Sequence, residues 1–474
     1  MYILLKNVHT LVTMDERERI INNVDVLIKD NVIKDIGNNI LDKYNELEIS
    51  KIIDCSNKVV YPGFINTHHH FYQSITRNVP FVQSSKLFDW LTNLYEVWSE
   101  LDEDFVKVGA QISAGELLLS GCTTSTDHYY IFPNSASNRL FDLEVDTVLD
   151  MGMRFYPNRG SMSRGKSEGG LPPDNLVQSS EEILSDCERV IQKYHNSNPY
   201  AMCRIILAPC SPFSITEELL CETSKFARKH NVMMHTHLCE TIDEETYCIE
   251  KMGKRPLQYM EDCNWVGNDV HYAHGIYFTD DEIKLLAKTG TGVSHCPGSN
   301  LRLGSGICKV PQMLKAGVKV GLSVDGSSSN DSSNYVREMQ LALLVHRLQS
   351  ADAITPIDVL RIATTGGAKI LNTPEIGNIK IGSAADIAIF NLRKLDYAGA
   401  MSDPASAIIM CGGGTRTDYT IVNGVIVVEN GKLVKINEEE IFDKSIEVTR
   451  KMIEKTSKRM GINYYQSNIS QKKE

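Results

Sequence analysis

The sequence lacks the segments that mark membrane-spanning and secreted proteins. No apolar run approaches the roughly 18 residues that a membrane-spanning helix needs. The opening segment, MYILLKNVHTLVTMD, soon becomes polar, whereas a secretory leader carries a sustained apolar core. The twelve cysteines stand singly along the chain, and no CxxC pair occurs. These absences favour a cytoplasmic protein in a reducing compartment, with free and mostly buried thiols.

Positive charge is also scarce. The chain has 49 Lys and Arg against 60 Asp and Glu, a net charge of -11, and its basic residues are scattered. Phosphate binding needs concentrated Lys and Arg, so the composition argues against a nucleic-acid partner. With 474 residues, 42% of them hydrophobic, we expect a globular protein with one large core and an accessory unit.

Both ends of the chain alternate short apolar runs with turn residues. Residues 1–60 show this rhythm, and it returns in residues 375–435, where Asn423-Gly424 and Asn430-Gly431 are strong hairpin signals. We expect the two segments to form one small, discontinuous β-sandwich domain, because the segment between them would fold into a closed unit and bring them together. The charged tail, residues 436–474, predicts a surface helix with a frayed end.

Residues 61–374 repeat a pattern of strand, loop and amphipathic helix. Eight apolar runs can be found: VVYPGFINTHHH, GCTTSTDHYY, MRFYPNRG, CRIILAPCSPF, NVMMHTHLCE, DVHYAHGIY, GTGVSHCPGSN and VKVGLSVDGSS. SSEEILSDCERVIQKYH and TEELLCETSKFARKH, which lie between such runs, begin with N-cap residues and acidic first turns. Eight strands with helical crossovers predict an α/β fold, a parallel (β/α)8 barrel.

Two inter-strand segments are unusually long for a compact barrel. Residues 71–100 hold several aromatic side chains, and residues 159–178 contain GGLPPD. Long loops over a barrel are commonly functional. We expect both segments to act as lids.

Polar side chains gather at the carboxyl ends of the predicted strands, which is the face where barrel enzymes place catalytic groups. His68 and His70 are two apart, so both imidazoles point into the barrel mouth, whereas His69 faces the helices. Adding His237 and Asp325 from later strands gives a mixed nitrogen and oxygen donor set. Such a set suits one divalent ion, Zn²⁺ in preference to Fe²⁺.

Other readings stay open for some of these side chains. His235 fits a polar core residue satisfied by hydrogen bonds, because it lies one pleat deeper than His237. His295 fits a metal neighbour, a substrate-binding donor or a packed core residue equally well. Asp325 could also form a simple Asx turn. Glu240 lies three residues beyond His237, from where it could reach over a substrate.

The motifs PGFINTHHH, HTHLCE, YAHG, HCPGSN and SVDG resemble the amidohydrolase superfamily, in its branch of cytosine deaminase, guanine deaminase and atrazine chlorohydrolase. The resemblance covers nearly the whole chain, including the divided β domain. Within the branch, THHHFYQSITR, LFDWLTNLYEVW, GSMSRGKSEGGLPPD, GTGVSHCPGSNLRLGSGI and VDGSSSND are most similar to 8-oxoguanine deaminase and hydroxyatrazine ethylaminohydrolase-like proteins. One departure is in the second strand, which reads DHYY where the resemblance predicts DHHY.

The resemblance implies roles at the matching positions. Glu240 and His274 would serve proton transfer and orientation, Gln73 and His274 would contact the heterocycle, and Asp325 would be both metal ligand and base. Relatives with two metals bridge them through a carboxylated Lys at the fourth strand end, and CRIILAPCSPF has no Lys there. One metal is therefore expected. The HxE and PCxxC pair of nucleic-acid-editing zinc deaminases is also missing.

The expected activity is hydrolytic deamination of an amino-substituted heterocycle, such as 8-oxoguanine, isocytosine or a related purine, pyrimidine or pterin, with release of ammonia. The partners would be that small molecule and water, without nucleic acid or membrane, in a homo-oligomer that the resemblance suggests. One rival is a triazine N-dealkylating aminohydrolase or chlorohydrolase. A rival of another class is a catalytically inactive assembly protein, which the presence of every expected ligand disfavours.

Overall fold

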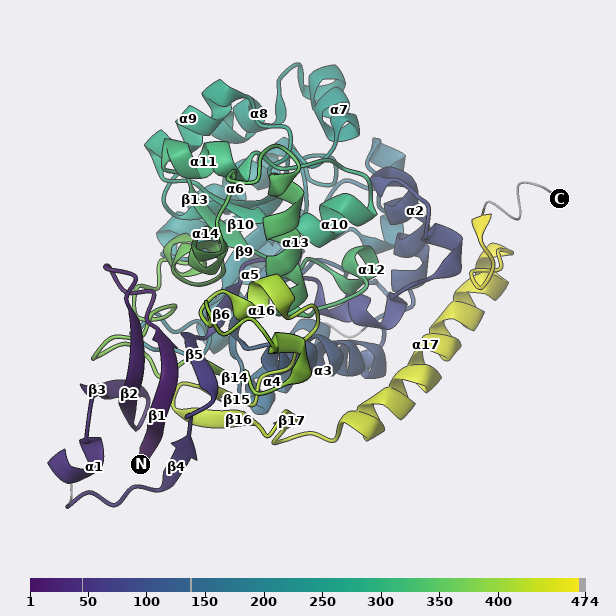
Figure 1. Cartoon of the computed structure of the whole chain (residues 1–474). Helices are drawn as coiled ribbons and strands as arrows, with labels where there is room; N and C mark the ends of the chain where they lie inside the picture. The colour runs from purple at the N-terminus through teal and green to yellow at the C-terminus, as the bar shows by residue number, and fades with distance from the viewer. Residues whose placement is uncertain (45, 137–138, 469–474) are drawn as a thin grey trace.

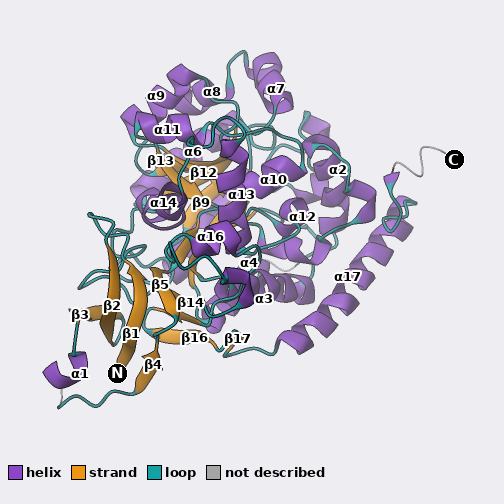
Figure 2. Ribbon diagram, viewed as in Figure 1, coloured by secondary structure: helices purple, strands orange, loops and turns teal. Residues whose placement is uncertain are grey.

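A computed structural model describes residues 1–44, 46–136 and 139–468. Its main body is an eight-stranded parallel sheet that is nearly closed into a barrel and is covered by helices. A nine-stranded mixed sheet lies at one side of the barrel, as Figures 1 and 2 show, and contains strands from both halves of the chain. The predicted fold class, a (β/α)8 barrel with a small extra β domain, is confirmed.

The barrel strands follow one another in space in the order in which they occur in the chain. They are β6 (Phe64–Asn66), β7 (Cys122–Tyr129), β8 (Arg154–Ser161), β9 (Ile206–Pro209), β10 (Met233–Leu238), β11 (Val270–His274), β12 (Gly292–His295) and β13 (Lys319–Leu322). The first and last strands meet at a seam, where the Thr67 amide donates to the Leu322 carbonyl oxygen at 3.3 Å. All strand carboxyl ends therefore open on the same face.

Helices cover the outside of the barrel and begin where the sequence signals predicted. Ser179 caps α5 (Ser180–Tyr194) in a capping box with Glu182, and the Thr216 side chain caps α6 (Glu217–Lys229). The other barrel helices are α3 (Glu103–Leu119), α4 (Leu140–Met151), α7 (Ile242–Met252), α8 (Pro256–Asp262), α9 (Asp280–Thr289), α10 (Pro297–Arg302), α11 (Val310–Ala316), α12 (Ser327–Asn330), α13 (Tyr335–Arg347), α14 (Pro356–Arg361) and α15 (Gly367–Ile370), with a π-helical turn, η5 (Ile362–Gly366), between the last two.

The mixed sheet joins the two ends of the chain. Its strands are β1 (Tyr2–Val12), β2 (Ile20–Lys29), β3 (Val32–Gly37), β4 (Lys51–Asp54), β5 (Lys58–Pro62), β14 (Ile387–Asn391), β15 (Tyr419–Val422), β16 (Val425–Glu429) and β17 (Lys432–Leu433). The junction is the antiparallel pairing of β5 with β14. Three short helices also lie in these terminal regions, α1 (Ile40–Lys43), η6 (Leu395–Tyr397) and α16 (Ala407–Cys411).

Both predicted hairpins are present in the mixed sheet. Asn423 and Gly424, with φ of 50° and 78°, connect β15 to β16. Asn430 and Gly431, with φ of 52° and 75°, connect β16 to β17. Positive φ at both central residues is the geometry of the type I′ turn that Asn-Gly favours.

The first predicted barrel strand is divided in the structure. Within VVYPGFINTHHH, β5 belongs to the mixed sheet and only β6 to the barrel. The division falls at Gly63, where a Cβ atom would lie 2.0 Å from Oγ1 of Thr123. A residue without a side chain is therefore needed at the point where the chain passes from one sheet to the other.

The segment 71–100 is mostly helical and not an open loop. It forms η1 (Phe71–Thr76), η2 (Pro80–Val82) and α2 (Leu87–Trp98). The C-terminal helix α17 (Glu438–Met460) lies along it, and Arg459 pairs with Glu96 and Glu100 at 2.8 Å and 2.7 Å. The segment 159–178 continues from β8 into two short turns, η3 (Lys166–Glu168) and η4 (Asp174–Leu176). The predicted frayed end from residue 469 lies outside the described residues.

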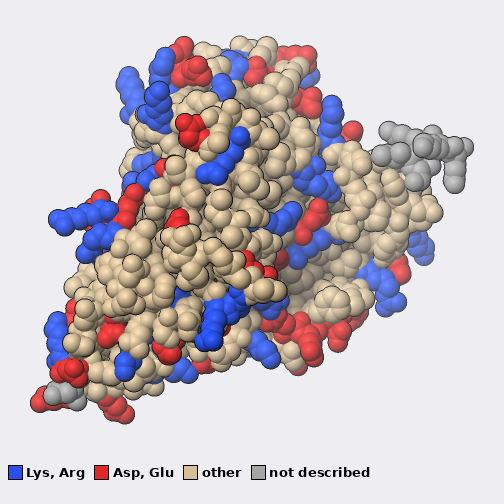
Figure 3. All heavy atoms as spheres, in the orientation of Figure 1, with Lys and Arg blue, Asp and Glu red and all other residues tan. Residues whose placement is uncertain are grey.

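The cysteines lie mostly in the interior of the protein, and charged side chains lie on its surface (Figure 3). All twelve cysteines are free thiols, and ten of them are buried. In the described part of the chain, no helix is both long and apolar enough to cross a membrane. Figure 3 shows acidic and basic side chains interspersed over the visible face, without a large patch of either sign.

Candidate active site

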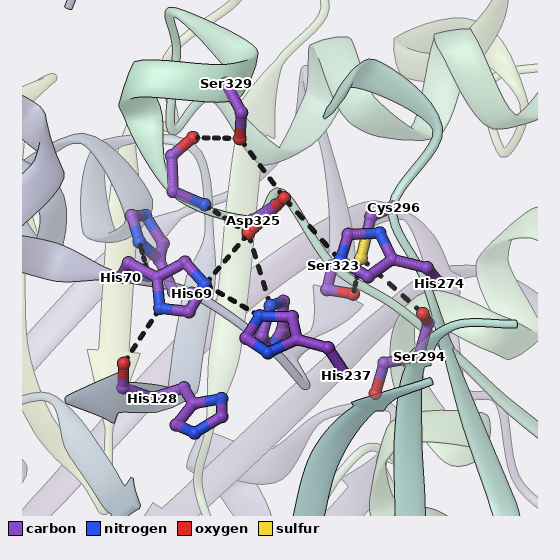
Figure 4. Close-up of polar contacts among 12 residues, drawn as sticks. His69, His70, His128, His237, His274, Ser294, Cys296, Ser323, Asp325 and Ser329 are labelled. Carbon is purple, nitrogen blue, oxygen red and sulfur yellow. Dashed lines mark hydrogen bonds and ion pairs between the residues drawn. The ribbon is translucent and has the colours of Figure 1, made fainter. Parts of the chain in front are cut away.

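Four strands of the barrel bring the predicted polar residues to one place. His68 and His70 follow β6, His237 lies in β10, His274 ends β11, and Asp325 lies three residues beyond β13. The carboxyl ends of these strands face the same mouth of the barrel, which explains why positions up to 257 residues apart converge. Figure 4 shows the Asp325 carboxylate among the surrounding imidazoles.

The distances among the four predicted ligands fit one small ion. The Nε2 atoms of His70 and His237 are 3.1 Å apart. Oδ1 of Asp325 lies 3.2 Å from Nε2 of His68 and 3.3 Å from Nε2 of His70. Donors bound tetrahedrally at about 2.0–2.2 Å from one ion are about 3.3 Å apart, so these atoms are arranged as a donor set.

The imidazoles are neutral, as metal ligands must be. Burial lowers the pKa of His68 and, together with the nearby His68, lowers that of His70 to about 3. Burial and the surrounding imidazoles hold the pKa of His237 well below its usual range. Nε2 of His68 is buried and makes no hydrogen bond among the described residues. A buried lone pair without a donor is costly unless an ion satisfies it.

Asp325 is held in a strained conformation that fixes the direction of its carboxylate. Its φ is 62°, in the left-handed region that non-glycine residues seldom adopt. Oδ1 accepts from the Gly326 amide at 2.7 Å, and Oδ2 accepts from the Ser329 hydroxyl at 3.2 Å. Although burial raises the pKa of Asp325, the surrounding groups, among them the charged His274, bring it well below the usual range. The carboxylate is therefore ionised.

Glu240 lies beside this set, and its pKa is shifted in the opposite direction from that of Asp325. Its side chain is almost fully buried, and burial raises its pKa to about 7. The Ser305 hydroxyl donates to Oε1 at 3.4 Å. The turn that presents Glu240 is fixed by the Glu244 carboxylate, which accepts from the amides of Cys239 and Glu240, both at 2.9 Å. At neutral pH, Glu240 can therefore both hold and release a proton.

His274 connects Glu240 with Asp325. Its Nε2 is 3.5 Å from Oε2 of Glu240 and 4.0 Å from Oδ2 of Asp325, and its Nδ1 donates to Oδ1 of Asn300 at 2.9 Å. Burial lowers the pKa of His274, but the nearby Glu240 carboxylate and further groups raise it well above its usual range. Its φ of 71° is again left-handed. With acceptors at both ring nitrogens, His274 is held as a donor.

A cavity opens over these groups. It is lined by His70, Gln73, Leu87, Trp90, Leu91, Tyr95, Tyr130, Cys210, Ser211, Phe213, His237, Glu240, His274, Leu303, Asp325 and Ser329. Its apolar lining is rich in aromatic rings, which suits a flat cyclic ligand. Buried polar atoms without a hydrogen-bond partner among the described residues include Oε1 of Gln73 and Nε1 of Trp90. Both residues could therefore bind ligand heteroatoms.

Two histidines of the sequence analysis lie away from the cavity. His295, predicted as a substrate-binding residue, points to α13, where its Nε2 is 3.1 Å from Nε2 of His346. The strand alternation turns it out of the barrel, so the structure gives it no place among the cavity residues. His69 faces outward as expected, with Nε2 at 2.9 Å from the Ser333 hydroxyl.

Several residues of the site were missed in the sequence. Asn300, Ser305 and Ser329 hold His274, Glu240 and Asp325 respectively. They lie in polar segments after strands, where nothing in the local pattern separates them from ordinary turn residues. The aromatic segment 71–100, by contrast, was predicted as a lid and supplies five of the cavity residues, Gln73, Leu87, Trp90, Leu91 and Tyr95. The segment 159–178 supplies none of the cavity residues.

With this geometry in view, comparison with known proteins defines the class. A profile of the Amidohydrolase family matches residues 59–427, so the chain belongs to the amidohydrolase family. The 8-oxoguanine deaminase of Pseudomonas aeruginosa is 44% identical over 379 residues, which cover 80% of this chain and 84% of that protein. Hydroxydechloroatrazine ethylaminohydrolase of Pseudomonas sp. strain ADP is 36% identical over 456 residues, 94% of each protein.

Solved structures agree with the sequence relatives. The crystal structure of atrazine chlorohydrolase TrzN from Arthrobacter aurescens TC1, complexed with zinc, superimposes with a TM-score of 0.89 at 30% identity, and the match covers 94% of this chain and 100% of that one. The chain is thus an enzyme, a hydrolase that acts on C–N bonds.

Proposed function

We propose that the chain is a zinc-dependent deaminase that hydrolyses a small aminated heterocycle to the carbonyl compound and ammonia. The observation that carries this proposal is the position of Glu240 and His274 beside Asp325, within one aromatic-lined cavity. The substrates we favour are 8-oxoguanine, isocytosine and related purines, pyrimidines or pterins. Similarity to an 8-oxoguanine deaminase supports this choice.

The metal we propose is a single zinc ion held by His68, His70, His237 and Asp325. When bound, such an ion lowers the pKa of a water molecule toward neutrality and so supplies a nucleophile at physiological pH. Neutral imidazoles with one carboxylate are a typical zinc donor set. The zinc in the TrzN structure supports the choice of metal. A single ion is favoured because β9 ends in Pro209, without a Lys that could bridge two metals.

The two oxygens of Asp325 are suited to different tasks. Oδ1 faces His68 and His70 in the donor set, whereas Oδ2 faces His274 and is held by the Ser329 hydroxyl. Oδ2 can therefore accept the proton of the attacking water. The Ser329 hydroxyl keeps this oxygen in position while the proton moves.

Glu240 supplies the proton that the heterocycle needs. An amino-bearing ring carbon is a poor electrophile until the adjacent ring nitrogen is protonated. With a pKa of about 7, Glu240 can deliver this proton, then take up the proton of the hydroxyl group bound to the ring carbon and pass it to the departing amine. The proton accepted by Asp325 then returns to Glu240 and restores the starting state. His274, as a charged donor, stabilises the negative charge that develops on the attacking oxygen. The products are ammonia and a ring carbonyl.

A panel of substrates tests this proposal. Protein of known zinc content is incubated with aminated purines, pyrimidines, pterins and triazines, and ammonia is measured. Release of ammonia from a purine or pyrimidine is expected. Absence of ammonia with every member of the panel, at one zinc per chain, would refute the proposal.

The second candidate is hydrolysis of a substituted triazine. Similarity to the ethylaminohydrolase and to TrzN favours it, because the same attack can expel an alkylamine or chloride. The two candidates differ in the product that leaves. Ethylamine from a hydroxylated triazine, without ammonia from the purines, would favour the second.

A further inference from the structure

The three imidazoles of the donor set are each held at the ring nitrogen that faces away from Asp325. His70 and His237 donate from Nδ1 to the main-chain oxygens of His128 and Cys210, at 2.8 Å and 2.6 Å. A carbonyl oxygen can only accept, so the hydrogen stays on Nδ1 and the lone pair on Nε2. Figure 4 shows this arrangement for His70 between His128 and Asp325. Two ligands are therefore fixed by the backbone.

His68 is held differently from the other two ligands. Its Nδ1 lies 2.8 Å from Nε2 of His235, which is a side-chain atom. An imidazole nitrogen can donate or accept, depending on which ring nitrogen carries the hydrogen. The contact with His235 alone thus leaves two tautomers of His68 possible, and only one of them has a free lone pair on Nε2.

The hydrogen bond at the other ring nitrogen of His235, Nδ1, selects one of these tautomers. Nδ1 of His235 lies 3.0 Å from the main-chain oxygen of His271 and must donate to it. A neutral His235 then has its lone pair on Nε2 and accepts from Nδ1 of His68. The hydrogen of His68 is thereby kept on Nδ1, and its lone pair is on Nε2, 3.2 Å from Oδ1 of Asp325.

Packing holds His235 in this orientation. Its side chain is fully buried, and its ring stacks on that of His271 with centroids 4.2 Å apart and planes at 26°. The ring of His128 lies 5.2 Å away on an edge-on approach. Turning the His235 ring over would break both of its hydrogen bonds in a site that water cannot reach.

A second metal site deeper in the barrel is the alternative reading of the same residues. One donor atom each of His68, His128 and His235 lie within 4.8 Å of one another. However, 2.8 Å between His68 and His235 is a hydrogen-bond distance, shorter than the ~3 Å or more expected for two nitrogens on one zinc ion. Nε2 of His128 donates to the Ala208 carbonyl oxygen at 2.7 Å, so only its Nδ1 could face an ion. A hydrogen-bonded relay fits these distances better.

We propose that His235 is a positioning residue that sets the tautomer and the ring orientation of His68 for metal binding, through the relay from His68 to His235 to the His271 carbonyl. Partners of this kind that orient a ligand typically change metal affinity by about 10- to 100-fold. The proposal rests on the zinc site of the proposed function. It predicts that a single buried side chain without metal contact controls zinc affinity.

The test measures zinc affinity directly, by competition with a chromophoric chelator on the full chain. His235→Phe keeps a ring of similar size but removes the acceptor, and we expect its dissociation constant for zinc to rise about 10- to 100-fold. His235→Gln restores an acceptor near the position of Nε2 and should bind zinc within about threefold of the wild type. His235→Asn, whose amide is too short to reach His68, covers the case in which the Phe variant does not fold, and it should also bind zinc weakly.

The matched control is His346→Phe, the same substitution at another buried histidine on α13. Its Nε2 lies 3.1 Å from Nε2 of His295, away from the donor set and the cavity. Its zinc affinity should therefore equal that of the wild type. The proposal is overturned if His235→Phe binds zinc as tightly as His346→Phe, or if the wild type holds two zinc ions and His235→Phe only one.

A further variant separates this inference from the zinc site itself. His68→Ala removes a ligand and should lower the zinc content of the purified protein. If His68→Ala binds zinc normally, the proposed metal site is wrong. If His68→Ala loses zinc while His235→Phe does not, only the positioning role of His235 is wrong.

Discussion

Glu240→Gln is the substitution that most directly separates proton transfer from the rest of the site. The amide has the size and shape of the carboxyl group and can still accept from the Ser305 hydroxyl, which lies 3.4 Å from Oε1. The main-chain contacts of the turn run to Glu244 and are unaffected. The variant should therefore fold, bind zinc and bind substrate, but it cannot deliver a proton.

The size of the effect follows from burial. General acid–base catalysis contributes about 10²–10⁴-fold to a rate, or about 3–5 kcal/mol of activation free energy. Glu240 is only 4% exposed, so solvent water has little access to replace it. It would also transfer protons twice, to the ring nitrogen and to the leaving amine. We therefore expect kcat to fall by about 10³–10⁴-fold, in the upper part of that range.

The assay is steady-state release of ammonia at saturating substrate, with zinc measured on the same samples. Glu250→Gln, the same chemical change on the exposed face of α7, is the control and should keep wild-type kcat. A Glu240→Gln protein with one zinc per chain and a kcat within tenfold of the wild type would refute the role of Glu240. Loss of zinc in this variant would show instead that Glu240 belongs to the donor set.

Three further predictions test other parts of the site and fold. Removing zinc with a chelator should lower the melting temperature, and zinc at about 1,000 times its dissociation constant should restore about 4 kcal/mol of the free energy of unfolding. A melting temperature that changes with neither treatment would contradict the metal site. Trp90→Phe keeps the ring but deletes the indole N–H, so KM should rise about 3- to 10-fold with little change in kcat; an unchanged KM would remove Trp90 from substrate binding. Glu144→Gln acts on a buried pair of carboxyl groups: burial raises the pKa of Asp127 to about 7 and, with Asp127 beside it, that of Glu144 well above its usual range. The unfolded chain releases these protons at a lower pH than the folded chain does. The contribution of the pair to the free energy of unfolding is therefore complete below about pH 4.5 and is lost as the pH rises through 7. Urea unfolding between pH 5 and 8 should therefore show a steeper loss of stability in the wild type than in Glu144→Gln, and equal slopes would contradict the pair.

Much of the barrel and the clustering of the candidate metal ligands could be predicted from the sequence because both depend on local patterns. The apolar runs alternate with capped helices, and the polar residues that end the runs must share one face of the barrel. The spacing of His68 and His70 predicted that both imidazoles share one side of the strand, and the later motifs with His237 and Asp325 strengthened the metal prediction. The same reasoning placed the hairpins at Asn423 and Asn430, where the turn type dictates the residues.

The features that could not be predicted from the sequence depend on contacts between segments far apart in the chain. The division of the strand at Gly63 depends on Thr123, which approaches from the next strand. No residue pattern within VVYPGFINTHHH predicts it. His295 ends a strand as His237 does, but it points away from the cavity to His346 on α13. The homo-oligomer that the resemblance implied stays a prediction, since it depends on contacts beyond one chain.

Three of the four proposed ligands, His68, His70 and Asp325, flank the seam where the barrel closes, which connects the site to the stability of the fold. In the described residues, the main-chain hydrogen bonds across this seam run from Thr67 to Leu322 and from Asp325 to His68, each of 3.3 Å, and do not form a regular ladder. His68 follows β6 on one side of this seam, and Asp325 follows β13 on the other side. An ion held by both would therefore bridge the two ends of the barrel sheet, and closure of the barrel would in turn bring the ligands together. Metal affinity and barrel stability are then two measures of one equilibrium, because a ligand that binds only the closed barrel stabilises it by mass action.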